Sequence, residues 1–309
     1  MRRPLLALGF TLGFTLVAAA CGGRADTRAA PLVLGFLPSQ QADSVLPDAK
    51  ALGAFLEARI GRPVDVVVPA TYEPLIEGFR FDRVQIAFLD GGAAWIAHKR
   101  TGAEVILAEV NAGETFYWAE AFTRKGSGIR TLPDVMGKRV AFTSRTGSSG
   151  FLMPIGTMIA EGLIPVDGDG LDALERALET SFARTIDAGG YQQALKAVLE
   201  GRADVAFGAH DSPTRFLTPA ERDQLTSFHR FGKIPSHAVL VSSTLDSATV
   251  TRVRDAFLAL NDAANLPLLK AIYGVDGVAV TTTQEHLGEF GRALEALPGM
   301  QQTLLSRTP

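Results

Sequence analysis

Between residues 32 and 108 the chain alternates short apolar runs with amphipathic stretches. The runs have the length and composition of buried strands, and they cover residues 32–37, 64–68, 84–89 and 105–108. The stretches between them carry apolar residues at helical spacing, and Gly61 ends the first one. Strands that alternate with helices form right-handed crossover units on a parallel sheet. The pattern therefore predicts an α/β fold.

A second set of strands and helices follows the first. Strands are predicted at residues 117–123, 140–142, 182–186 and 204–208, and a helix at 191–200. Residues 234–241 are expected to form a strand that leads back out of this set. A chain of 309 residues is long enough for two domains of ordinary size.

Several polar residues come directly after predicted strands. Ligands of parallel sheets bind beyond the carboxyl ends of the strands. Ser39, Tyr72 and Asp90 are therefore expected at the binding rim of the first sheet. Asp211 follows the strand at 204–208 and is expected at the rim of the second.

The stretch from 138 to 154 reads as a strand, a turn rich in Gly, Ser and Thr, and the opening of an apolar helix. A helix N-terminus leaves free backbone N–H groups and carries partial positive charge, so it can hold an anion. Ser148 and Ser149 add hydroxyl donors, and Gly150 lets a ligand approach the backbone. The structural alternative is an ordinary Ser N-cap on a structural helix.

The N-terminus has the features of an export signal. Arg2 and Arg3 precede an uncharged apolar stretch, and three small residues stand directly before Cys21. This end resembles the lipobox of bacterial lipoproteins, which implies a signal peptide at 1–20, a lipid on Cys21 and a tether at 21–30. The protein is then exported and anchored to the membrane. The alternative is a cleaved soluble signal with an incidental cysteine.

Charge and composition argue against several function classes. Without residues 1–20 the chain has 28 basic against 33 acidic residues and no basic run, which argues against nucleic-acid binding. One cysteine allows no disulfide within a chain, and five scattered histidines give no paired metal-ligand spacing. No Gly-x-Ser-x-Gly segment or phosphate-binding Lys loop is present. We expect no cofactor, no metal and no catalysis.

Several segments together resemble the substrate-binding proteins of phosphonate, phosphite and phosphate ABC importers, over nearly the whole mature chain. The most specific is Ser-Ser-Gly-Phe-Leu-Met-Pro at 148–154. The others stand at 35–39, 71–76, 117–118, 124–129, 132–134, 137–139 and 203–206. Their order and spacing carry the resemblance.

The resemblance implies the two-lobe fold of periplasmic binding proteins (type II), in which each lobe is a mainly parallel sheet flanked by helices. Lobe 1 would comprise residues 31–120 plus 235–309, and lobe 2 residues 121–234. Two hinge segments near 118–124 and 231–237 would join them.

The resemblance also implies roles for individual residues. Ser148, Ser149 and the Gly150 amide would hold the oxyanion, while Tyr72 and Tyr117 would line the cleft. Tyr117 is favoured over Trp118 because adjacent strand residues face opposite ways.

The sequence also departs from the family pattern. The family often has a histidine just before the next helix, where Ala188-Gly189-Gly190 stands here; either a strong donor is missing, or Tyr191 replaces it through its hydroxyl. Asp211 could hold an amino group of the ligand, but His237 stands where an acid is expected, and Asp90 would repel a dianion. Aminoalkylphosphonate is therefore a doubtful ligand. Structural alternatives remain: packing for Tyr72 and Tyr117, capping for Asp211 and an ordinary core or surface position for His237.

The function expected is a monomeric, tethered receptor that captures a small tetrahedral oxyanion and presents it to an ABC permease. A second hypothesis keeps the binding protein but docks it on a membrane sensor histidine kinase. A third is an enzyme acting on a small phosphorylated compound, which would need a base near Ser148.

Overall fold

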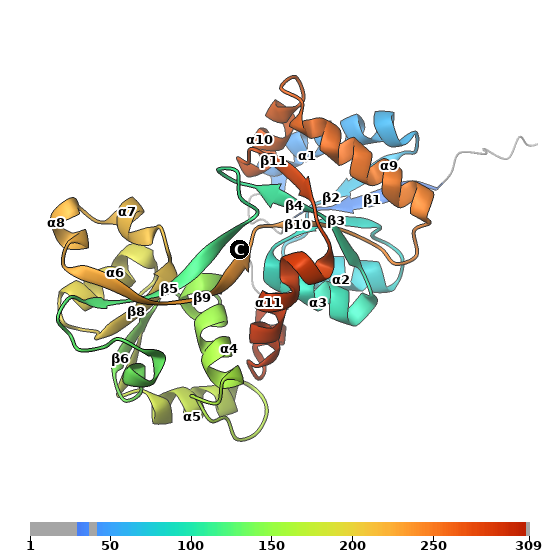
Figure 1. Ribbon diagram of the computed structural model, residues 1–309. Coiled ribbons are helices and arrows are strands. Elements are labelled where there is room, and N and C mark those ends of the chain that lie inside the picture. Colours follow the sequence, from blue (N-terminus) through green and yellow to red (C-terminus); the bar gives the residue numbers. More distant parts are fainter. Residues whose placement is uncertain (1–29, 37–41, 307–309) are drawn as a thin grey trace, which may run out of the picture.

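The computed structural model describes residues 30–36 and 42–306 (Figure 1). The expected signal peptide, Cys21 and Ser39 lie outside these residues. Within them, no helix has the length and apolar character needed to cross a bilayer. Figure 1 shows two sheets set apart from each other, each with its own helices.

The first sheet has six strands in the order β11-β4-β10-β3-β1-β2. Its strands are β1 (Leu32–Gly35), β2 (Val64–Val67), β3 (Ile86–Leu89), β4 (Glu104–Val110), β10 (Ala238–Val241) and β11 (Gly277–Val280). Its helices are α1 (Ala42–Ile60), α2 (Glu73–Arg80), α3 (Gly91–Thr101), α9 (Ser247–Leu258), α10 (Leu266–Tyr273), α11 (Thr283–Glu295) and α12 (Met300–Ser306), with a 3₁₀ turn at Ala259–Asn261. The expected strand-helix alternation at the start of the chain is thus present.

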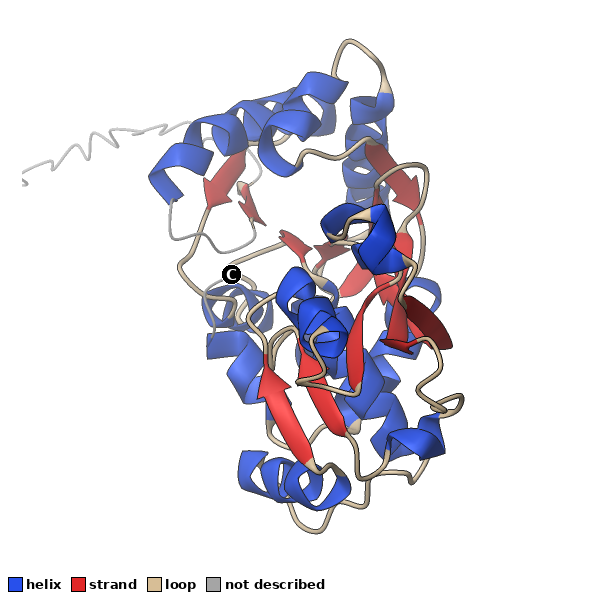
Figure 2. Cartoon of the chain, turned by 90° about the vertical axis from the view of Figure 1, so that its left-hand side faces the viewer, coloured by secondary structure: helices blue, strands red, loops and turns tan. Residues whose placement is uncertain are grey.

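The second sheet has five strands in the order β7-β6-β8-β5-β9. Its strands are β5 (Phe116–Arg124), β6 (Arg139–Phe142), β7 (Arg184–Asp187), β8 (Val205–Ala209) and β9 (Leu225–Pro235). Its helices are α4 (Met153–Ala160), α5 (Leu171–Ser181), α6 (Tyr191–Leu199), α7 (Ser212–Phe216) and α8 (Pro219–Arg222), with a 3₁₀ turn at Leu132–Val135 and a π-turn at Ser148–Leu152. In the turned view, helices flank the strands (Figure 2).

Both sheets are mixed, which refines the expected mainly parallel arrangement. In the first sheet β1, β2 and β3 pair in parallel, while β10 enters antiparallel between β3 and β4. In the second, β6 is parallel to β7 and β8, and β5 is antiparallel to its two neighbours. Most strands of each sheet still point the same way, so their carboxyl ends meet at one edge. The α/β class and the two-sheet fold are confirmed.

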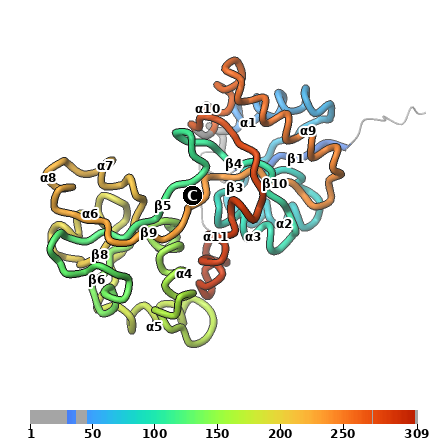
Figure 3. The backbone as a smooth tube through the Cα atoms, in the orientation of Figure 1, coloured from blue at the N-terminus to red at the C-terminus, as the bar shows by residue number. Residues whose placement is uncertain are grey.

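Strands β5 and β9 are long and pair along most of their length, from Phe116 opposite Pro235 to Arg124 opposite Leu225. Figure 3 shows these two segments running side by side from one half of the molecule toward the other. They include the stretches where the hinges are expected. Toward the second sheet, β5 also pairs with β8. At the opposite end, β5 follows β4 and β9 leads into β10, and both β4 and β10 belong to the first sheet.

Helices α4 and α11 form a second bridge between the halves. A Cβ atom built on Gly156 of α4 would lie 2.1 Å from the carbonyl oxygen of Ala293 on α11. Only a residue without a side chain permits this approach. The largest buried apolar cluster accordingly includes Ile155 and Met158 of α4 together with Phe290 and Leu294 of α11.

Candidate functional site

The Ser-Ser-Gly turn lies where β6 ends and the helix begins. The Leu152 amide donates to the Gly147 carbonyl at 3.0 Å, and the Met153 amide donates to the Ser148 carbonyl, which makes the opening a π-turn. The π-turn runs directly into α4, with Pro154 in the first turn of the α-helix, where its missing N–H is tolerated. The first amides of such a helix have no helical acceptor. The opening can therefore present N–H groups to an anion.

Gly150 has a packing role in this turn. A Cβ atom on Gly150 would lie 1.9 Å from Oγ1 of Thr143, and one on Gly147 would lie 2.7 Å from the same atom. Thr143 is buried, so its side chain cannot simply swing aside. The two glycines let the turn fold back onto Thr143, in addition to any room they leave for a ligand.

Ser149 belongs to a buried cluster of hydroxyl groups. Its Oγ shares a hydrogen bond of 2.9 Å with the Tyr191 hydroxyl, and the residue is fully buried. Burial, with Tyr191 and Asp211 nearby, raises the pKa of Tyr117 far above its ordinary value, against an opposing hydrogen bond from Ser149. The Tyr117 hydroxyl therefore stays protonated at every physiological pH. The structure thus brings together three of the predicted residues as neutral hydroxyl groups.

Tyr191 is held in place by its ring as well as its hydroxyl. It is the first residue of α6, and its ring stacks on Phe216 at 6.0 Å between centroids and 10° between planes. This packing aims the hydroxyl at Ser149 across 42 residues of sequence. The Tyr191 hydroxyl thus lies beside Ser149, and its contact with a ligand stays a prediction.

Asp211 lies beside the hydroxyl cluster. Its Oδ2 is 3.5 Å from Nη1 of Arg215, and its Oδ1 is buried with no hydrogen-bond partner among the described residues. It makes no side-chain cap to α7. The capping alternative for Asp211 is therefore not supported, and an acceptor atom remains available near Tyr117.

Arg145 stands close to the turn in sequence, but its charge is used locally. Its Nε lies 2.9 Å from Oδ1 of Asp187, and Nη2 lies 3.3 Å from Oε2 of Glu175. The guanidinium also lies over the rings of Phe142 and Phe151. The hydroxyl cluster therefore has no dedicated cation from this residue.

The first sheet contributes Tyr72, Asp90 and His237. Tyr72 precedes α2 and is only 1% exposed within the apolar core. Oδ1 of Asp90 accepts a hydrogen bond of 2.9 Å from the Ala93 amide and so caps α3. His237 immediately precedes β10 and therefore lies at the edge where β3 and β4 end.

A residue that the sequence analysis missed completes this edge. Nδ1 of His237 lies 2.7 Å from Oε2 of Glu109, which is 3% exposed on β4. Burial lowers the pKa of His237, but the hydrogen bond and charge of Glu109 and the charge of Asp90 raise it above its ordinary value. The available signal was an acid at the end of the apolar run 105–108.

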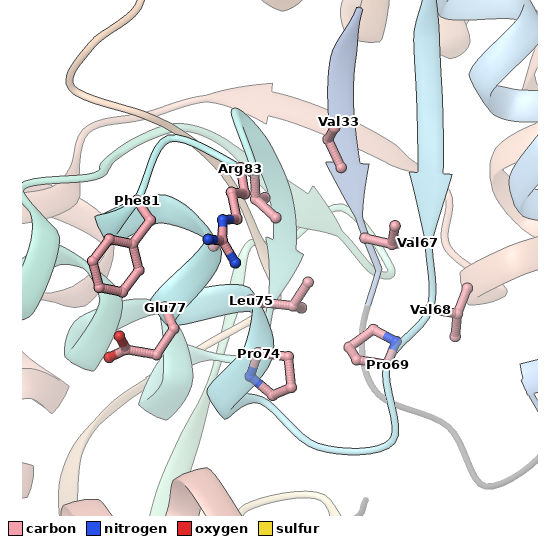
Figure 4. Close-up of a pocket in the computed structure, with 11 residues that line it drawn as sticks. Val33, Val67, Val68, Pro69, Pro74, Leu75, Glu77, Phe81 and Arg83 are labelled. Carbon is pink, nitrogen blue, oxygen red and sulfur yellow. The ribbon is translucent and has the colours of Figure 1, made fainter.

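An apolar groove lies elsewhere in the described part of the chain. It has a volume of about 500 Å³ and lies between α2 and the strands β1 and β2 (Figure 4). Its charged lining residues are Glu77 and Arg83, and the rest are mainly Val, Pro and Leu. Such a lining does not suit an oxyanion, which needs many donors. Among the described residues no group of His, Cys, Asp and Glu could hold a metal ion.

Comparison with known proteins points to one family. Residues 34–287 match the family described as "ABC transporter, phosphonate, periplasmic substrate-binding protein". The phosphonates-binding periplasmic protein of Escherichia coli (strain K12) is 25% identical over 261 residues, which cover 82% of this chain and 73% of that protein.

Two solved structures show the same fold. XAC2383 from Xanthomonas citri bound to ATP superposes with a TM-score of 0.65 at 20% identity, over 87% of this chain and 98% of that one. PhnD1 from Prochlorococcus marinus (MIT 9301) in complex with methylphosphonate gives a TM-score of 0.51 at 15% identity, over 86% and 98%. At these identities the likeness concerns the fold alone.

Proposed function

The chain belongs to the family of periplasmic substrate-binding proteins of phosphonate ABC transporters, and on that basis we propose that it captures a small tetrahedral oxyanion in a cleft between two lobes. Phosphonate, phosphite and phosphate are the candidate ligands. Family members bind their ligand without transforming it, so the enzyme hypothesis is set aside. The lobes correspond to residues 31–120 plus 235–309 and to residues 121–234, and they close on the ligand.

The observation that carries this proposal is the hydroxyl cluster at the start of the π-turn. Ser149, Tyr117 and Tyr191 supply neutral donors, and Ser148 and the Gly150 amide stand at the same helix opening. A buried oxyanion needs dense hydrogen bonds, and neutral donors supply them without a fixed counter-ion. Tyr72 is 1% exposed in the apolar core, and this burial supports the packing alternative for it over a ligand contact.

Asp211 would let the hydroxyl cluster distinguish ligands by their protonation state. An ionised carboxylate only accepts hydrogen bonds. Its buried Oδ1 would therefore pair with a protonated ligand oxygen and would repel a fully ionised one. Sulfate, which carries no proton at neutral pH, would be disfavoured.

Cys21 would carry the lipid anchor after export, which keeps the receptor beside its permease. The two sheets and the hinge pairing lie within one chain, so a monomer is sufficient for closure. Rim residues of both lobes would be presented to the permease in the closed form.

A ligand panel tests the proposal. The purified mature chain is heated with phosphate, phosphite, methylphosphonate, arsenate or sulfate, each at millimolar concentration. A ligand present at 1,000 times its Kd stabilises the folded state by about 4 kcal/mol, which corresponds to roughly 8–16 °C in Tm for a protein of this size. Sulfate serves as the control of equal shape. An unchanged Tm with every anion would contradict the oxyanion proposal.

A further inference from the structure

His237 and Glu109 form a close pair at the edge of the first sheet. Besides the 2.7 Å contact between Nδ1 and Oε2, the Glu109 amide donates to the His237 carbonyl at 2.9 Å. The His237 amide lies 3.2 Å from Oε2 of Glu109 and donates to it. Backbone and side chain thus fix the imidazole relative to the carboxylate.

Glu109 is nearly inaccessible to water, since only 3% of it is exposed. A buried carboxylate is costly unless a positive group or several donors face it. Ser236 does not serve as that donor, because its Oγ donates to the Glu109 backbone carbonyl. The imidazolium form of His237 supplies the missing charge.

The other charged or titratable neighbours of His237 act in both directions. Asp90, at the end of β3, favours the imidazolium, whereas burial opposes it. The Nε2–H of His286 on α11 donates to the Ser236 carbonyl at 2.9 Å, and burial lowers the pKa of His286, as does the charge of His237. Burial and the charge of His237 therefore both disfavour the charged form of His286.

Nε2, the second ring nitrogen of His237, is not the one in contact with Glu109. Nδ1 is buried and lies 2.7 Å from Oε2 of Glu109, an ion-pair contact without the alignment of a hydrogen bond, and 40% of the side chain is exposed. The residue follows Pro235, which pairs with Phe116, next to Tyr117. His237 and Tyr117 thus stand at neighbouring ends of the two crossing segments, on the side where the strands of the first sheet end.

We propose that Glu109 holds His237 as an imidazolium whose Nε2–H donates to the ligand from the first lobe, so that the cleft attracts tetrahedral oxyanions and rejects those that carry an ammonium group. This inference rests on the proposed function. Glu109 acts through His237 and is a positioning residue, whereas His237 touches the ligand. Like charges at contact distance repel, which is the basis of the rejection.

The pH dependence has a defined sign. His237 is charged below its raised pKa and loses the charge as the pH rises through it, so the first lobe's attraction for a dianion weakens there. The ligand's own second proton titrates in the same region. At each pH the ligand has the same protonation state in both experiments. The ratio of the Kd of His237→Gln to the Kd of the wild type therefore reports the contribution of His237.

Two measurements test the inference on the mature chain. Histidine NMR titration, with His237 assigned through His237→Gln, reads the pKa in the wild type and in Glu109→Gln. Calorimetry with ethylphosphonate and 2-aminoethylphosphonate, which differ only in the amino group, between about pH 5.5 and 8.5 reads binding in the same proteins. His229→Gln, a change on β9 outside the seat, is the matched control.

We expect His237 to titrate above about 6.5 in the wild type and lower in Glu109→Gln. We also expect ethylphosphonate to bind at least tenfold more tightly than 2-aminoethylphosphonate, its amino analogue, a preference that shrinks in His237→Gln. A wild-type His237 that titrates at or below its ordinary value overturns the inference, as does equal binding of the two ligands. If the wild type binds no phosphonate, phosphite or phosphate, the proposed function fails with the selectivity, whereas the NMR titration still tests the Glu109–His237 pair.

Discussion

Replacing Tyr191 with Phe tests whether its hydroxyl group binds the oxyanion. The change keeps the ring, and therefore the stacking on Phe216 at 6.0 Å. It removes one partner of the 2.9 Å hydrogen bond with Ser149, which is fully buried. The substitution thus isolates one hydroxyl group.

The size of the effect follows from these contacts. Losing a neutral hydrogen bond costs about 0.5–1.5 kcal/mol, and leaving the Ser149 hydroxyl unsatisfied raises this to about 1–3 kcal/mol. At about 2–4 °C for each kcal/mol, the Tm without ligand should fall by roughly 2–12 °C. A hydrogen bond to a charged ligand is worth about 1.5–3 kcal/mol, so the Kd should rise by about 10- to 150-fold.

Calorimetry with the anion that stabilises the wild type most is the assay. Ser149→Ala should weaken binding by a similar factor, and the double variant by less than the product, because the two hydroxyls share one bond. Thr157→Val on α4 is the control, since its hydroxyl contacts only the Met153 sulfur at 3.7 Å among the described residues. An unchanged Kd in Tyr191→Phe, beside weaker binding in Ser149→Ala, would refute the role of Tyr191.

Three further outcomes are expected. Gly156→Ala should lower the stability by about 1–3 kcal/mol in urea unfolding, because its Cβ meets the Ala293 carbonyl oxygen at 2.1 Å; full stability would show that α4 and α11 can separate freely. Asp204→Asn should destabilise the protein at pH 7, because hydrogen bonds from Arg139 lower the pKa of Asp204. That stability is present above the ordinary Asp value of about 3.9 and disappears as the pH falls through the lowered pKa, so an equal loss in acid would contradict the pairing. Cys21→Ser should release the exported protein from the membrane fraction, and continued membrane attachment would argue against a lipid on this residue.

Local patterns made much of the fold predictable. The strand, turn and helix around the Ser-Ser-Gly segment lie within 138–154, and their periodicity is visible without any partner. The predicted rim residues Tyr72, Asp90 and Asp211 all follow strands in the structure, because residue order along each unit decides what comes after a strand. The prediction for Tyr191 came from the family resemblance and its position; the structure adds its 2.9 Å contact with Ser149, and its role toward a ligand stays a prediction.

Other features depended on contacts that periodicity does not encode. Glu109 appeared in the sequence only as the end of an apolar strand, because its partner His237 lies 128 residues away. Gly150 was interpreted as making room for a ligand, whereas the position of its absent Cβ is filled by the side chain of Thr143. Neither could be predicted, since each depends on how close two elements approach.

The sequence by itself determined the α/β class, the two sets of strands and the Ser-Ser-Gly helix opening, because strand and helix periods are local properties of the chain. Only the tertiary structure decided that β10 inserts between β3 and β4. That insertion brings His237 to the edge of the sheet where β3 and β4 end, in contact with Glu109. Strand order in a sheet is set by packing between distant segments, and no run of neighbouring residues records it.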